Sequence, residues 1–117
     1  MTSTAWGAVA TKCVDGVTTG SDYCHGGSSS GDTLTVTLPS TGIVTRIEIW
    51  NRPGQESRMV GAEVKAGDTL CETVSASQAK YVITCSSVET DTVTITTVNW
   101  LNLIEVKVFG RSKKINW

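Results

Sequence analysis

"TLTVTLPSTGIVTRIEIW", residues 33–50, contains two runs in which apolar and polar side chains alternate, the pattern of half-buried β-strands. Pro39 is expected to end the first strand, because proline has no backbone N–H to donate to a neighbouring strand. The second run, residues 43–50, places Arg46 and Glu48 on the face that we expect to point to solvent. The opposite faces of the two runs hold Leu34, Val36 and Leu38, then Ile43, Thr45, Ile47 and Ile49.

Further short runs of β type follow, separated by residues typical of turns: 59–66, 69–73, 80–85, 90–98 and 101–109. Helical periodicity is nearly absent, so the sequence predicts an all-β fold, an antiparallel β-sandwich with Greek-key or jelly-roll connections. With 117 residues, the chain is long enough for one domain and too short for two. We expect this domain to cover residues 1–110, followed by a basic tail, residues 111–117.

The charge and the hydropathy of the chain argue against two classes of partner. A net charge of -1 provides no broad positive field, so nucleic acid is not an expected partner. No stretch reaches the roughly 18 to 20 apolar residues that span a bilayer, and no membrane insertion is expected. Residues 1–20 lack a basic and then apolar leader, so a secreted form would begin here at its mature part.

Four cysteines, an even number without the spacing of a zinc ribbon, indicate disulfides. Three pairings are possible, and we favour Cys13–Cys24 with Cys71–Cys85 because each closes a short loop. Four free buried thiols are the alternative. Residues 15–32 are too polar for a strand and long for a connection, which is typical of a functional loop, and Cys24 would pin it.

"VTRIEIWNRPGQESRMVGAEVKAG" (44–67), followed by "YVITC" (81–85) and "LNLIEVKVFG" (101–110), resembles the F-type lectins, the fucose-binding fucolectin domains. The likeness runs from about residue 10 to 110, and it implies a jelly-roll of the galactose-binding and discoidin group. The family's sugar signature is a His, then twenty-six residues, then Arg-x-Asp, then four residues and a second Arg or Lys. Here residues 26–51 separate His25 from Arg52.

The resemblance implies that His25, Arg52 and Arg58 bind the sugar. The match departs from the family at two places: Gly54 stands where the family has Asp, and Arg58 comes one residue early. A neighbouring pair of cysteines found in many members is also absent from this turn.

The chemistry of a neutral sugar fits this set, because arginine offers a rigid fork of donors to ring oxygen and hydroxyls. Two arginines aimed at one place repel, and Glu56 is the only carboxylate left in the turn to hold them apart. We therefore expect Glu56 to take over part of the role of the family's Asp. The sugar's apolar face would lie against Tyr23, Trp50 or Pro53.

The family carries a calcium ion that pins the loop beside the sugar site. The residues carried over as carboxylate ligands are Asp15, in "VDG", and Glu105, in the last strand. Oxygen ligation of this kind suits calcium rather than a transition metal. The set implied by the resemblance is completed from Lys12, Val17, Tyr23 and Ile104.

Together these features predict a secreted lectin domain that recognises terminal fucose or a fucose-like sugar, with calcium as a structural ion. Its partners would be fucosylated glycans or glycoproteins, bound with added strength through oligomers or tandem copies. The alternative is a structural or protein-interaction domain with a degenerate sugar site. We do not expect an enzyme, because the chain has one histidine and no nucleophile motif.

Overall fold

The computed structural model describes residues 24–25 and 29–112, which form an antiparallel all-β domain, as predicted. Its strands are β1 (Cys24–His25), β2 (Thr33–Asn51), β3 (Glu63–Ala66), β4 (Thr69–Thr73), β5 (Lys80–Thr96) and β6 (Asn102–Ser112). A short 3-10 helix, η2 (Glu56–Met59), follows β2. The strands pair in the order β1-β6-β2-β5-β3-β4. No helix in the described part of the chain combines the length and the apolar character needed to cross a membrane.

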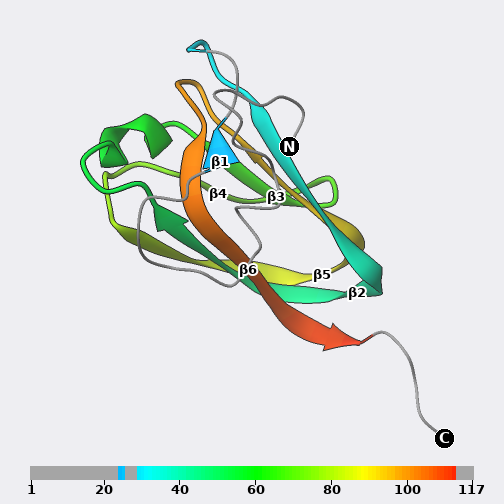
Figure 1. Cartoon of the computed structure of the whole chain (residues 1–117). Helices are drawn as coiled ribbons and strands as arrows, with labels where there is room; N and C mark the ends of the chain where they lie inside the picture. The colour runs from blue at the N-terminus through cyan, green and yellow to red at the C-terminus, as the bar shows by residue number, and fades with distance from the viewer. Residues whose placement is uncertain (1–23, 26–28, 113–117) are drawn as a thin grey trace, which may run out of the picture.

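Two long strands, β2 and β5, bend so that each contributes to both layers of a β-sandwich (Figure 1). Residues 46–50 of β2 pair with residues 80–84 of β5 on one side and with β6 on the other, which makes the first layer. Residues 33–37 of β2 pair with residues 92–96 of β5, and β3 and β4 extend this second layer. The predicted sandwich is confirmed, with fewer and longer strands than expected.

The predicted end of a strand at Pro39 was wrong, because β2 continues through it. The register of β2 against β5 is interrupted between Thr37 and Gly42, so Pro39 lies where the ladder requires no backbone N–H. Figure 1 shows β2 turning back on itself in this region. The runs 80–85 and 90–98, predicted as separate strands, are likewise parts of β5. At the other end of the domain, β6 continues through Ser112, beyond the expected start of the tail at residue 111.

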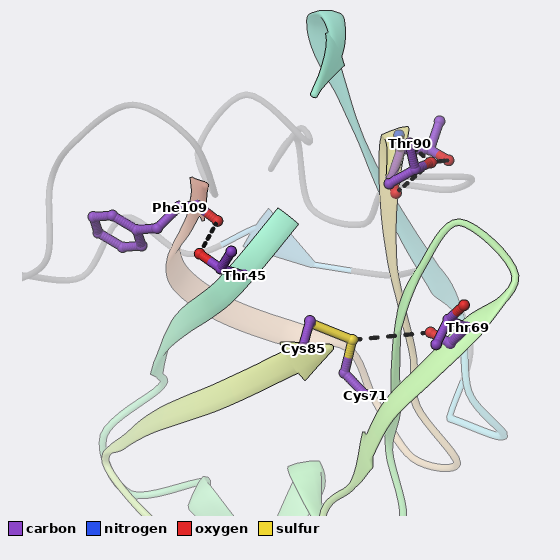
Figure 2. Close-up of a disulfide and its surroundings, with 7 residues drawn as sticks. Thr45, Thr69, Cys71, Cys85, Thr90 and Phe109 are labelled. Carbon is purple, nitrogen blue, oxygen red and sulfur yellow. Dashed lines mark hydrogen bonds between the residues drawn. A yellow bond between two sulfur atoms is a disulfide. The ribbon is translucent and has the colours of Figure 1, made fainter. Parts of the chain in front are cut away.

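A β-bulge at Thr45 changes which residues of β2 face the core. Between Val44 and Arg46 the register of β2 shifts against both β5 and β6, and the Thr45 hydroxyl donates to the carbonyl oxygen of Phe109 at 3.3 Å (Figure 2). Val44 is therefore buried while Ile43 is only half-buried, so the prediction that Ile43 shares the core face with Ile47 was wrong. One extra residue on one strand reverses the alternation beyond it.

The outer face of the first layer carries charged and aromatic residues in contact. Glu48 accepts from Arg46 Nε at 3.0 Å and lies 3.4 Å from Lys80 Nζ, so both predicted outward residues are on this face, with the Glu48 side chain only 15% exposed. Lys80 and Lys107 approach the ring of Trp50 to 4.6 and 5.1 Å. These cation–π contacts occupy Trp50, one of the residues considered for the sugar's apolar wall.

The core lies between the two layers, and its buried apolar side chains include Leu34, Ile47, Ile49, Val64, Ile83, Val93, Ile95, Leu101 and Leu103. The predicted Cys71–Cys85 disulfide is confirmed. It joins edge strand β4 of the second layer to the part of β5 that belongs to the first layer, with a Cα–Cα distance of 5.0 Å (Figure 2). The predicted Cys13–Cys24 bond lies outside the described residues.

We predict that the double variant Cys71→Ala/Cys85→Ala loses about 3 kcal/mol of unfolding free energy, because the bond closes a loop with a sequence separation of 14 residues and no longer limits the unfolded chain. Urea unfolding followed by tryptophan fluorescence measures the difference. A loss below about 1 kcal/mol would show that the link between the layers contributes little.

Candidate functional site

The turn that follows β2 carries both arginines of the predicted sugar site. The amide N–H of Gln55 donates to the carbonyl of Arg52 at 3.2 Å, and that of Arg58 donates to the carbonyl of Gln55 at 3.1 Å. Gly54 allows this tight path, because its φ of +82° lies in the left-handed region. An aspartate at this position, as in the F-type lectin signature, would be strained in the same conformation. The substitution of Gly54 for Asp therefore fits the shape of this turn.

Asn51, the last residue of β2, fixes the turn to the rest of the domain. It is only 2% exposed, and its Nδ2 donates to the carbonyl oxygens of Glu56 and Gln78 at 3.0 and 3.1 Å. Its Oδ1 accepts from the backbone N–H of Arg52 at 2.8 Å. Its own backbone N–H donates to the carbonyl of Ala79 at 2.8 Å. Both hydrogens of the side-chain amide and the backbone N–H of Asn51 thus form hydrogen bonds, which hold the arginine turn against residues 78–79.

A second hydrogen-bonded group fixes the loop on which Asn51 depends. The hydroxyl of Tyr81 is buried in the core, donates to the carbonyl of Ala76 at 2.7 Å and accepts from the N–H of Gln78 at 3.1 Å. Asn51 and Tyr81 were not identified from the sequence. The available signal was an Asn at the end of an apolar strand, immediately before the arginine.

The three predicted sugar-site residues of this turn, Arg52, Glu56 and Arg58, are all half-buried. Glu56 and Arg58 belong to η2, where residues two apart do not face each other. Among the described residues, the carboxylate of Glu56 is in no ion pair with either arginine. The role expected for Glu56 stays a prediction.

The sheet register brings the backbone of His25 close to the arginine turn. β6 lies between β1 and β2, and Leu103 pairs with Cys24 on one side and with Asn51 on the other. Both neighbouring strands are antiparallel to β6, so they run in the same direction. His25, one residue after Cys24, and Arg52, one residue after Asn51, therefore lie on the same side of Leu103. Two strand spacings separate their backbones, about 10 Å.

The start of β6 holds the two calcium positions that fall within the described residues. Glu105 is 3% exposed, so its carboxylate lies inside the fold. Ile104 is skipped in the register between β6 and β2, so it is the extra residue of a β-bulge. A buried carboxylate next to a backbone carbonyl at a bulge supplies two oxygen ligands of the kinds that calcium prefers.

The remaining predicted ligands, Lys12, Asp15, Val17 and Tyr23, lie outside the described residues. Within the part of the chain that is described, no three His, Cys, Asp or Glu residues are grouped as a metal site. The calcium expectation therefore depends on Glu105 and Ile104 here.

Comparison with solved structures identifies the fold. The f-lectin (fucolectin) from Morone saxatilis (striped bass) serum superposes with a TM-score of 0.83 at 21% identity, covering 94% of this chain and 44% of that one. The chain has the F-type lectin fold. The jelly-roll expected from the sequence resemblance is thus confirmed.

Two further solved structures superpose with this chain over most of its length. The lectin domain of lectinolysin, solved in complex with Lewis B antigen, has a TM-score of 0.80 at 21% identity and covers 95% of this chain and 90% of that one. The CBM62 module of Clostridium thermocellum Xyl5A has a TM-score of 0.80 at 18% identity, covering 97% and 93%. No family model matches the sequence, and no curated protein matches it.

We predict that Asn51→Ala lowers the unfolding free energy by about 3 kcal/mol, because several buried groups lose their hydrogen-bond partner at once. The matched control is Asn99→Ala, which removes one exposed hydrogen bond to the N–H of Trp100. Chemical unfolding of both variants decides the point, and equal losses in the two would contradict the role of Asn51.

Proposed function

We propose that this domain binds carbohydrate, with terminal fucose or a fucose-like sugar as its ligand. The observation that carries the proposal is the register across β6, which sets His25 and Arg52 on either side of one strand. Arg58 lies on the same turn as Arg52. The solved neighbours support the ligand class, because they include a fucolectin, a fucose binding module and a lectin domain in complex with Lewis B antigen.

In this proposal the arginines recognise the sugar by donating hydrogen bonds. A guanidinium group has five donors in a fixed plane and can bridge a ring oxygen and an adjacent hydroxyl. Because Asn51 already holds the turn, little backbone freedom is lost on binding, and preorganisation of this kind improves affinity. His25 supplies a further polar contact and Tyr23 an apolar surface.

Calcium belongs to the proposal as a structural ion. Glu105 and Ile104 would hold it at the start of β6, with Asp15, Lys12, Val17 and Tyr23 from the preceding loop. The ion would add an electrostatic interaction with the carboxylate of Glu105. Its proposed task is to fix the loop that carries His25.

The proposal is one of binding without catalysis, in an extracellular protein. The Cys71–Cys85 disulfide supports secretion, because such bonds persist in oxidising compartments. A single sugar site binds weakly, so the partners would be fucosylated glycans or glycoproteins engaged through oligomers or tandem copies.

A second candidate function is a structural or protein-interaction domain with a degenerate sugar site. Two observations favour it: Gly54 with its positive φ replaces the family's Asp, and Glu56 forms no ion pair with the arginines among the described residues. The two candidates differ in whether any free sugar binds.

We predict that fucose binds to the wild-type domain and that Arg52→Ala weakens binding at least tenfold, because a charge-assisted hydrogen bond contributes about 1.5 to 3 kcal/mol. His25→Ala should weaken it as well. Isothermal titration with fucose, after a glycan array has ranked the ligands, measures both effects.

Arg111→Ala is the matched control, because Arg111 is exposed at the far end of β6 and its loss should leave fucose affinity unchanged. A wild-type domain that binds no glycan would favour the degenerate-site candidate. Equal affinities of the wild-type and Arg52→Ala proteins would place the sugar elsewhere.

A further inference from the structure

Asn102, the first residue of β6, has a buried amide group without hydrogen-bond partners. The residue is 2% exposed, and neither Nδ2 nor Oδ1 forms a hydrogen bond. Buried polar side chains in folded proteins are nearly always paired, because desolvation without a partner is unfavourable. The side-chain amide of Asn51, which pairs with the next residue of β6, Leu103, is fully hydrogen-bonded by contrast. The two unpaired amide atoms of Asn102 therefore suggest that a bound ligand interacts with them.

The bulge at Ile104 determines which way the start of β6 faces. Glu105 pairs with Trp50 and Leu103 pairs with Asn51, so Ile104 is the extra residue. Leu103 and Val106 belong to the core cluster. Strand alternation on each side of the bulge then places Asn102 and Glu105 together on the opposite face of β6. Both are nevertheless buried, at 2% and 3% exposure.

The groups gathered at this end of β6 are hard oxygen donors. They comprise the amide oxygen of Asn102, the carboxylate of Glu105 and the carbonyl of Ile104, the extra residue of the bulge. Oxygen atoms of these three kinds are the ligands that calcium prefers. Along a strand, the Cα atoms of residues 102 and 105 lie about 10 Å apart. Side chains of this length can span that distance and bind the same ion.

We propose that Oδ1 of Asn102 is a ligand of the calcium ion, beside Glu105 and Ile104. The inference rests on the calcium ion of the proposed function and adds a ligand to it that the family resemblance did not supply. A sugar is the poorer candidate, because a ligand arriving from solvent does not reach a side chain that is 2% exposed. A small ion that is enclosed as the domain folds can contact this buried side chain. The Nδ2 of Asn102 can then donate to a water molecule bound to that ion.

The position of Asn102 gives this ligand a consequence for sugar binding. Asn102 pairs with His25, and the next residue of β6, Leu103, pairs with Asn51 at the base of the arginine turn. An ion held by Asn102 would fix β6 at the level where it separates the two sides of the proposed sugar site. Calcium and sugar should then strengthen each other's binding by the same factor.

Calcium titration of an Asn102→Leu variant tests the proposal. Leucine preserves the volume and removes both amide atoms. Calorimetry on chelator-stripped protein should give calcium binding to the wild type and at least tenfold weaker binding to Asn102→Leu. Without calcium, Asn102→Leu should melt at the wild-type temperature or above it, because an unpaired buried amide has been removed.

Asn99→Leu is the matched control, since Asn99 is exposed and lies just before the strand; its calcium affinity should equal that of the wild type. A second variant, Asn102→Asp, retains the oxygen and adds charge, so it should bind calcium several-fold more tightly. It also provides the test if Asn102→Leu does not fold.

Wild-type calcium affinity in Asn102→Leu, or weaker calcium binding in Asn102→Asp, overturns this inference and leaves the proposed function untouched. A wild-type protein that binds fucose but no calcium overturns both the inference and the proposed ion, while the sugar proposal stands.

Discussion

The side chain of Asn51 is the constraint on which the proposed site depends. It ends β2, lies buried, and holds the backbone of Arg52, Glu56 and Gln78 through hydrogen bonds of 2.8 to 3.1 Å. A surface turn with two arginines would otherwise sample many conformations, and ordering it on binding would reduce affinity. Because the ordering is already achieved by folding, the arginine turn is a fixed part of the scaffold. Loops held in this way by a rigid sheet are where binding residues are commonly found.

The scaffold itself follows from two strands that bend. β2 and β5 contribute to both layers, the break in register between Thr37 and Gly42 accommodates Pro39, and the bulge at Thr45 sets the core-facing side of the rest of β2. A second bulge, at Ile104, does the same at the start of β6 and leaves a buried carboxylate and a buried amide on the face away from the core. Irregularities of this type are frequent beside functional sites, because they redirect side chains without ending the sheet. In this domain the second one lies between β1 and the arginine turn.

Sequence patterns were sufficient for the fold class, the sandwich, the Cys71–Cys85 bond and, through resemblance, the F-type lectin fold. They failed at Pro39 and Ile43, because a two-residue period counts residues and cannot detect an extra one in a bulge. Sequence patterns likewise did not identify Asn51, Tyr81 and Asn102, because the role of a buried polar side chain depends on partners that are distant in the sequence. The expected roles of His25, Arg58, Glu56 and Asp15 stay predictions, and so does the Cys13–Cys24 bond.

The central claim is that one ligand binds between β1 and the turn after β2, across the start of β6. Two-dimensional amide NMR of the labelled domain during a fucose titration tests it most directly, because each backbone N–H reports its own surroundings. The account predicts that the largest shift changes occur at His25, at residues 52–58 and at the start of β6. Largest changes on the outer face around Trp50, or along the threonine-rich strands at residues 33–37 and 92–96, would contradict it.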